Sequence, residues 1–346
     1  MSKKAVWGVL APSVVACLLL AGCAPKPAPE PPAATPAPKT EPTKAEPKGE
    51  PAKAGKKIVL GFAQVGAESG WREANTKSIQ GEATKRGHDL RFSDAQQKQE
   101  NQIKAIRSYI TQKVDVIAFS PVVETGWDTV LGEAKAANIP VILSDRTIKA
   151  ADESLFTAFV GSDFKTEGVR AGEWLVKRMG GKAKILELQG TPGSAPANAR
   201  RDGFAEAIKK AAGMKIVLSK TGEFTRAKGK EVMEAFLRTP EGKEANALFA
   251  HNDDMAIGAI QAIEAAGKQP GKDIVIVSID GVKAAFDAMK EGKLNCTVEC
   301  NPLLGPAMFD LAEKIVGKQE FKKINWSEEG VFDDTNYQTV IDKRQY

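Results

Sequence analysis

The chain has 346 residues, and its 49 basic and 44 acidic residues give a formal net charge of +5 at pH 7. This excess is mild, and the part of the chain after its first apolar run holds no basic block of the kind that binds nucleic acid. The length suits two domains better than one small core. Composition therefore favours a two-domain globular protein and argues against a nucleic-acid partner.

The first residues have the pattern of an export signal. Two lysines precede an apolar run over residues 5–22, which ends in Leu-Ala-Gly directly before Cys23. A basic flank, an apolar core and a small-residue cleavage site are typical of secretory signals. The ending resembles bacterial lipoprotein signals, so residues 1–22 are predicted to be removed and Cys23 to be lipidated. An uncleaved membrane helix is the alternative, because about 17–25 apolar residues span a bilayer, but Pro12 and the Leu-Ala-Gly-Cys ending disfavour it.

Residues 23–56 are predicted to be a lipid-anchored linker. The stretch is dominated by Pro, Ala, Lys and Glu, and it has no aromatic residue and no periodic apolar face. Such a segment cannot bury enough surface to fold and is expected to be a disordered tether. The protein is therefore expected to be exported and held at a membrane, periplasmic or on the cell surface. ATP and NAD are scarce there, and no cofactor is predicted.

Short strands alternate with amphipathic helices from residue 57 onward. The predicted strands are 58–64, 90–94, 114–120, 140–144, 156–161, 184–189, 215–221, 247–251, 274–280 and 294–300. The predicted helices are 71–87, 99–112, 127–138, 166–179, 197–212, 226–238, 254–267 and 283–291. Repeated βα units form parallel sheets with helices on both faces, and nearly continuous apolar strands are typical of such buried sheets. The pattern predicts an α/β fold with two doubly wound parallel-sheet lobes.

Two cysteines, Cys296 and Cys300, lie in one predicted strand. Residues four apart in a strand are separated by about 13 Å, whereas a disulfide needs Cα atoms within roughly 7 Å. A metal pair is the other option, but no His or further Cys lies near them in the sequence. We therefore predict two small, buried thiols and no metal site.

The residues that follow the predicted strands share one chemistry. Ligands of open parallel sheets bind beyond the carboxyl ends of the strands. There the chain carries polar and charged side chains with interspersed aromatic rings, namely Glu68, Trp71, Arg72, Gln97, Trp127, Asp145, Arg146, Arg200, Phe224, Asn252 and Asp280. A hydroxyl both donates and accepts hydrogen bonds, so it suits this mixture of carboxylates, amides and guanidinium groups. The apolar faces of a sugar ring pack on aromatic rings, so the set predicts a polyol ligand.

Each of these residues also has a purely structural interpretation. Asn252 could cap the helix that follows it, and Asp280 could belong to a turn. Asp145 and Arg146 could form a surface ion pair of little value, and Trp71 could be a core residue. The shared position of all of them at one end of successive strands favours the binding interpretation.

The order of these motifs resembles the periplasmic sugar-binding proteins of the ribose-binding type over residues 57–346. The motifs are Trp71-Arg72, Asp145-Arg146, Arg200, His-Asn-Asp-Asp-Met at 251–255 and Ser-Ile-Asp-Gly at 278–281. Stretches 64–72, 96–105, 121–127 and 228–234 resemble the galactofuranose-binding members more closely. Ribose binders place two Phe residues where this chain has Trp71 and Arg72. The difference favours a hexose in the furanose form, with Arg72 holding its exocyclic diol.

The resemblance also implies a role for each candidate residue. Trp71 and Phe224 are expected to sandwich the sugar ring. The residues expected to hold its hydroxyls are Asp145, Arg146, Arg200, Asn252 and Asp280. Those expected to shape the selective wall are Glu68, Arg72, Gln97 and Trp127. Which of Glu299, Cys300 and Asn301 reaches the ligand is left open.

The same resemblance implies a type I periplasmic binding protein fold, with three chain crossings that form a hinge between the lobes. The crossings are expected near residues 161–163, 300–302 and 332–335. The first lobe is predicted to comprise 57–162 and 301–331, and the second 163–300 and 332–346. A monomeric protein of this kind closes over one monosaccharide and delivers it to an ABC-type permease.

Three other functions compete with this interpretation. A lipoprotein that presents bound sugar to a chemoreceptor or sensor kinase fits the sequence equally well. An enzyme is disfavoured, because the chain has only His88 and His251, no nucleophile elbow and no phosphate loop. A transcription repressor would need an N-terminal helix-turn-helix, in place of which this chain has an export signal. The prediction is therefore a sugar-binding lipoprotein and not an enzyme.

Overall fold

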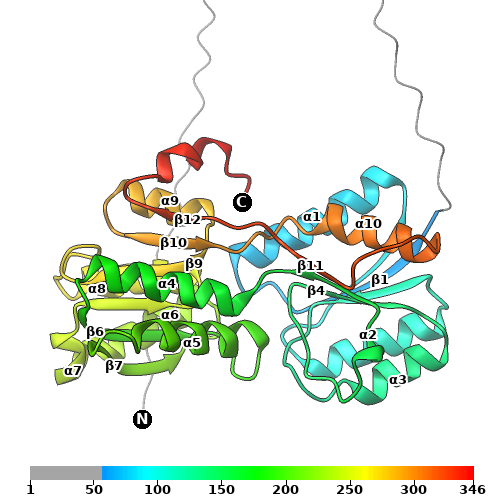
Figure 1. Ribbon diagram of the computed structural model, residues 1–346, viewed down its shortest axis with the longest axis horizontal. Helices are drawn as coiled ribbons and strands as arrows, with labels where there is room; N and C mark the ends of the chain where they lie inside the picture. Colours follow the sequence, from blue (N-terminus) through cyan, green and yellow to red (C-terminus); the bar gives the residue numbers. More distant parts are fainter. Residues whose placement is uncertain (1–56) are drawn as a thin grey trace, which may run out of the picture. The chain divides into compact units, whose positions relative to one another are not determined.

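The strands form two six-stranded sheets, each wrapped by helices (Figure 1). The computed structural model describes residues 57–346, so the predicted signal, the lipidation site Cys23 and the linker 23–56 lie outside the described residues. All neighbouring strands run parallel except at one edge of the second sheet. The predicted α/β class with two parallel-sheet lobes is confirmed.

The first sheet has the strand order β11-β5-β4-β3-β1-β2. Its lobe contains β1 (Val59–Gln64), α1 (Gly70–Arg86), β2 (Asp89–Asp94), α2 (Gln99–Thr111), β3 (Val116–Phe119), α3 (Asp128–Ala136), β4 (Val141–Ser144), the 3-10 turn Glu153–Leu155, β5 (Ala158–Gly161), α10 (Gly305–Val316) and β11 (Ile324–Trp326). Every residue of β3, β4 and β5 is buried. Their continuous apolar sequences fit because helices cover both faces of the sheet.

Two separate cores lie on the faces of this sheet. Ile79 of α1 packs with Met308 of α10 on one face, and Figure 1 shows these two helices side by side. Ile106 of α2 packs with Leu131 of α3 on the other face. Helix α1 begins after Ser69, whose hydroxyl accepts a hydrogen bond from the Arg72 backbone amide at 3.1 Å.

The second sheet has the order β12-β10-β9-β8-β6-β7. Its lobe contains α4 (Phe164–Arg178), β6 (Lys182–Gln189), α5 (Ala195–Ile208), β7 (Gly213–Thr221), α6 (Arg226–Arg238), α7 (Pro240–Glu244), β8 (Ala247–Ala250), α8 (Asp253–Ala265), β9 (Val275–Asp280), α9 (Lys283–Lys290), β10 (Cys296–Glu299), β12 (Val331–Asp333) and the 3-10 turns Tyr337–Thr339 and Ile341–Lys343. Helix α4 packs on α5, and α6 packs on α8. Phe204 and Phe249 stack at 4.0 Å between α5 and β8.

Three segments carry the chain between the two sheets. The first joins β5 to α4, and the second joins β10 to α10, both where the sequence predicts a crossing. The third joins β11 to β12 through residues 327–330, earlier than the predicted 332–335. The reason is that residues 331–333 already belong to the second sheet, where Phe332 pairs antiparallel with Thr297 of β10.

The ten predicted strands correspond to β1–β10, with ends shifted by a few residues. Strands β11 and β12 and helices α7 and α10 were not predicted. Cys296 and Cys300 are free, buried thiols, as predicted. Within residues 57–346, no helix combines the length and the apolar character needed to cross a bilayer.

Candidate functional site

Side chains from the carboxyl ends of strands in both sheets meet around one cavity of about 280 Å³. It is lined by Glu68, Ser69, Trp71, Arg72, Asp145, Arg146, Phe164, Pro196, Arg200, Phe224, Asn252, Asp280 and Cys300. The lining combines carboxylates, guanidinium groups and an amide with aromatic rings, which is the mixture that suits the hydroxyls and apolar faces of a polyol.

Nine of the eleven candidate residues line this cavity, and Gln97 and Trp127 do not. Trp127 is 1% exposed and lies in the core of the first lobe, where its Nε1 donates to the Val123 carbonyl at 2.7 Å. The Trp127 ring therefore packs in the core of the lobe and does not face the cavity. Gln97 is exposed and has a left-handed backbone conformation, with φ 61°. Its backbone amide donates to the Val65 carbonyl. The expectation that Gln97 and Trp127 form the wall of the cavity is therefore wrong for this structure.

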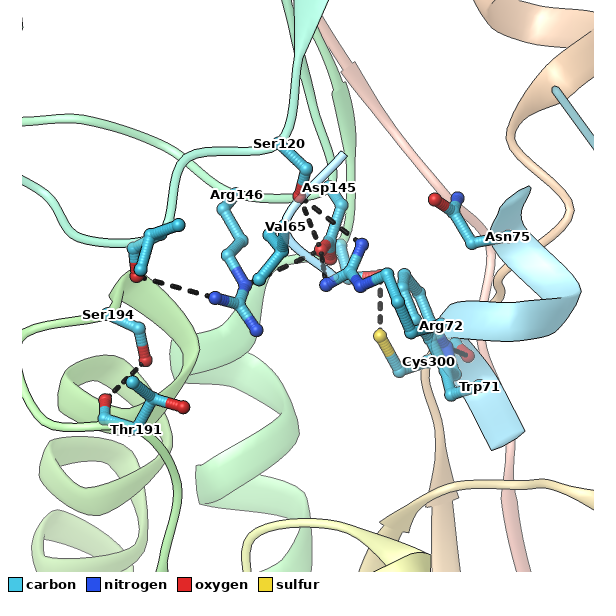
Figure 2. A network of polar contacts seen from close by, with 12 residues as sticks. Val65, Trp71, Arg72, Asn75, Ser120, Asp145, Arg146, Thr191, Ser194 and Cys300 are labelled. Atoms are coloured by element: carbon cyan, nitrogen blue, oxygen red, sulfur yellow. Dashed lines mark hydrogen bonds and ion pairs between the residues drawn. The ribbon is translucent and has the colours of Figure 1, made fainter. Parts of the chain in front are cut away.

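Arg72 is held almost entirely by protein atoms. Its Nη2 donates to Asp145 at 2.6 Å, and its Nε donates to Glu68 at 3.1 Å. Its Nη1 donates to Gln64 at 3.2 Å and to Ser120 at 3.3 Å. Figure 2 shows Arg72, Asp145 and Ser120 pointing toward one another. A guanidinium has five N–H groups, so these contacts leave one for a ligand, and Arg72 acts mainly as the support of its neighbours.

Asp145 directly follows β4 in a left-handed conformation, with φ 65°. Non-glycine residues adopt this region at a cost, and such positions cluster at functional sites. One carboxylate oxygen, Oδ2, accepts from Arg72 and, at 3.0 Å, from Ser120. Within residues 57–346 the other oxygen has no hydrogen-bond donor, so it is available to a hydroxyl in the cavity.

Arg146 and Glu68 carry unused polar atoms. Arg146 Nε and Glu68 Oε2 are buried and lack a hydrogen-bond partner among the described residues. The contacts that Arg146 does make are long, at 3.4 Å to the Val122 carbonyl and 3.4 Å to Glu68. Burial, together with the nearby charge of Arg72, lowers the pKa of Arg146 to about 10. A buried donor and a buried acceptor that lack partners are costly, so a ligand hydroxyl that serves both would stabilise them.

The second lobe contributes a matching half-site around Arg200. Arg200 Nε donates to Glu167 at 2.7 Å, and Nη1 donates to the His251 carbonyl at 2.7 Å. Its Nη2 lies 3.6 Å from Asp280. Burial raises the pKa of Asp280 well above its ordinary value, although Arg200 opposes that shift. Asp280 has φ 134° at the end of β9, so it too sits in a costly backbone conformation.

Asn252 performs two tasks at the edge of this half-site. Its Oδ1 accepts from the Met255 amide at 3.0 Å and caps α8, as its structural interpretation predicts. Its Nδ2 donates to the Phe224 carbonyl at 3.1 Å and fixes the loop that carries the Phe224 ring. Asn252 also lines the cavity, so the helix cap and a binding role coexist.

The two aromatic candidates come from different lobes. Trp71 of α1 is 4% exposed, and its Nε1 donates to the Cys300 carbonyl at 2.6 Å. Phe224 follows β7 with φ 63°, and its ring lies directly over Gly190, where an added Cβ would approach its Cζ to 1.9 Å. Both rings line the cavity.

Four lining residues were not among the candidates: Ser69, Phe164, Pro196 and Cys300. The position rule could have found Phe164 and Pro196, because they open the helices that follow β5 and β6. Of the three residues left open, Glu299, Cys300 and Asn301, only Cys300 lines the cavity. Glu299 turns away to accept from the Tyr346 hydroxyl, Asn301 accepts from the Leu303 amide, and Cys300 reaches the cavity.

The only donor cluster of metal-binding type among residues 57–346 is Glu167, Cys300 and Glu329, whose ligand atoms lie within 4.8 Å of one another. Glu167 is already paired with Arg200. Glu329 accepts from the Ser162 hydroxyl and, at 3.2 Å, from the Asn301 amide. Glu167 Oε1 has no hydrogen-bond partner among the described residues, but the Arg200 guanidinium beside this carboxylate disfavours a second cation, so we assign no metal to the cluster.

Comparison with known proteins agrees with this geometry. Residues 60–320 match the model of the periplasmic binding protein domain. The chain belongs to the periplasmic binding protein family. It is 53% identical over 259 residues to the galactofuranose-binding protein YtfQ of Escherichia coli strain K12, covering 74% of this chain and 81% of that protein.

Two solved structures are similar to this chain over most of their length. One is the binding component of the arabinose ABC transporter of Shewanella sp. ANA-3, bound to α- and β-L-arabinofuranose. It has a TM-score of 0.81 and 50% identity, over 83% of this chain and 95% of that one. The other is a Mycobacterium smegmatis protein in complex with β-D-fucofuranose, with a TM-score of 0.81 and 50% identity over 84% and 95%. The fold of the present chain is accordingly the type I periplasmic binding protein fold.

Proposed function

We propose that this chain is the sugar-binding component of an ABC-type importer and closes over one monosaccharide in the furanose form. Galactofuranose and arabinofuranose are the leading candidates. The observation that carries the proposal is the division of the cavity lining between two lobes, with Trp71 and Arg146 on one and Arg200 and Asp280 on the other. The relatives that are described as binding galactofuranose, arabinofuranose and fucofuranose support it.

Closure would follow from the split site. A sugar contacts both half-sites only when the lobes are together, so binding shifts the population toward the closed state. Moving that equilibrium from 1:99 to 99:1 requires a preference for the closed state of about 5.5 kcal/mol. Charge-assisted hydrogen bonds contribute roughly 1.5–3 kcal/mol each. Two to four of them, from groups such as Arg146 and Asp280, would suffice.

Delivery completes the proposed role. Lipidation at Cys23 would hold the protein at the outer face of a membrane, and the 23–56 linker would let the folded part reach a permease. The function is binding and release rather than catalysis. Replacing Cys23 by Ala is expected to abolish labelling with a fatty acid and to release the protein from the membrane fraction. Retained labelling would refute the anchor without touching the sugar site.

Calorimetry tests the sugar proposal. L-Arabinose and D-galactose, which contain furanose forms at equilibrium, are expected to bind the full chain, whereas methyl β-D-galactopyranoside, locked as a pyranose, is expected to fail. Arg146→Ala and Asp280→Ala are each expected to weaken binding at least 100-fold while the protein stays folded. Trp127→Phe, outside the lining, is the matched control and should retain affinity. Unchanged affinity in both cavity variants, or equal binding of the locked pyranoside, would refute the assignment.

A further inference from the structure

Two polar contacts join the lobes outside the sugar cavity. The first involves Asp254, which is 5% exposed in the first turn of α8. Its Oδ2 accepts from the Gly70 amide at 2.7 Å, across the boundary between the lobes. Arg226 holds the other carboxylate oxygen, with Nη2 at 2.8 Å and Nε at 3.1 Å. The carboxylate therefore points at Gly70 because Arg226 positions it.

This contact suits the electrostatics of a helix end. Gly70 is the first residue of α1, and the first amides of a helix have no partner within the helix. The N-terminus also carries partial positive charge, which favours a carboxylate. The Ser69 hydroxyl satisfies the Arg72 amide, and Asp254 of the second lobe satisfies the Gly70 amide of this first-lobe helix. That bond can exist only when the lobes are together.

The second contact involves Glu124, which follows β3. Its carboxylate accepts from the Asn198 side-chain amide of α5 at 2.6 Å, and its backbone amide donates to the Gly193 carbonyl at 2.9 Å. Lys149 of the same lobe lies 3.0 Å from that carboxylate and steadies it. Here too, a first-lobe group meets a second-lobe group by hydrogen bonds that separation of the lobes would break.

Neither Asp254, Gly70, Glu124 nor Asn198 lines the cavity. Their interactions therefore favour the closed state whatever the ligand is. We propose that Asp254 and Glu124 are positioning residues that form a two-point clasp, which sets the closing equilibrium and thereby the overall affinity, while the cavity residues set sugar choice. The proposal rests on the proposed function. Apparent affinity scales with the fraction of protein that can close, so loosening the clasp weakens every sugar equally.

Asp254→Ala and Asn198→Ala test this directly, because each removes one inter-lobe bond without altering the lining. Calorimetry with L-arabinose and D-galactose is expected to show about tenfold weaker binding for Asp254→Ala, and about three- to tenfold for Asn198→Ala. The ratio of the two sugar affinities stays as in the unaltered protein. The double variant is expected to show roughly the product of the two losses, because the contacts share no residue. Glu231→Ala is the matched control, since it removes an ion pair with Lys228 inside one lobe.

A melting experiment separates a clasp from a merely structural contact. Without sugar, Asn198→Ala is expected to melt at the same temperature as the unaltered protein, and Asp254→Ala slightly lower, because it also loses its ion pair with Arg226 within the second lobe. With sugar, the rise in melting temperature of each clasp variant is expected to be smaller. Affinities within twofold of the unaltered protein, a changed ratio between sugars, or an equal loss of melting temperature with and without sugar would each overturn the clasp. Failure of the unaltered protein to bind any sugar would instead refute the proposed function.

Discussion

A half-buried carboxyl in the hinge, that of Glu329, makes stability depend on pH. Glu329 lies in the third crossing, where it accepts hydrogen bonds from Ser162 and from the Asn301 amide. Burial, and next the neighbouring Glu167 carboxylate, raise the pKa of Glu329 from 4.5 to about 8. The charge of Arg200 opposes this shift, but Arg200 is already engaged by Glu167 at 2.7 Å. The folded protein therefore prefers Glu329 protonated, whereas the unfolded chain ionises it in mild acid.

The raised pKa of Glu329 fixes the direction and the upper limit of the change in stability with pH. A raised pKa in the folded state means that stability is intact below about pH 4.5, falls as pH rises toward 8, and then levels off. Each pKa unit corresponds to about 1.4 kcal/mol, so the shift sets an upper limit of about 5 kcal/mol. Local relaxation and solvent reduce such values, and we expect about 1–3 kcal/mol between pH 5 and pH 9.

Glu329→Gln isolates this contribution, because the amide oxygen can still accept from Ser162 and Asn301 but cannot ionise. Urea unfolding at pH 5, 7 and 9 is expected to show similar stability for the variant and the unaltered protein at pH 5. At pH 9 the variant is expected to be more stable by about 1–3 kcal/mol. Glu328→Gln, an exposed neighbour, is the matched control. Three other carboxyl groups also have raised pKa values, those of Asp253, Asp280 and Glu167. They are present in both proteins, so they cancel in the comparison. The same dependence of unfolding free energy on pH in Glu329→Gln and in the unaltered protein would refute the reasoning.

Three further predictions concern aromatic side chains. In Gly190→Ala the new Cβ would lie 1.9 Å from the Phe224 ring, so the ring must move. Sugar affinity measured by calorimetry is expected to fall at least tenfold. Unchanged affinity would contradict a role for the Phe224 ring in binding. Trp71→Phe removes the 2.6 Å hydrogen bond to Cys300 and is expected to weaken binding about tenfold, consistent with roughly 1–1.5 kcal/mol for a hydrogen bond. Trp127→Phe is expected to lower the melting temperature by a few degrees and leave sugar affinity intact. Loss of affinity in Trp127→Phe together with unchanged affinity in Trp71→Phe would contradict the assignment of Trp71 to the cavity and Trp127 to the core.

The sequence predicted the parallel strands well because burial on both faces leaves a clear apolar signal. Strands such as β3 and β8 are wholly buried, and their short apolar sequences stand out between helices. The missed strands β11 and β12 have three residues each, lie at sheet edges and contain no fully buried residue. Edge strands of this kind depend on pairing with a distant neighbour, which local sequence does not encode.

The sequence predicted where in the fold the candidate residues lie, but not which way their side chains point. The rule that ligands meet the carboxyl ends of parallel strands brought nine of the eleven candidates to the cavity. It could not tell that Trp127 turns into the core, or that Arg72 spends four of its donors on Gln64, Glu68, Ser120 and Asp145. Both outcomes depend on side chains that come from other elements of the fold.

The most direct test of the account is a crystal structure of the protein with L-arabinose or D-galactose bound. We expect one furanose ring between Trp71 and Phe224, with hydroxyls bound by Arg146 of the first lobe and by Asp280 of the second. A sugar held by one lobe alone, or bound anywhere outside this cavity, would contradict the claim that two half-sites close over a single ligand.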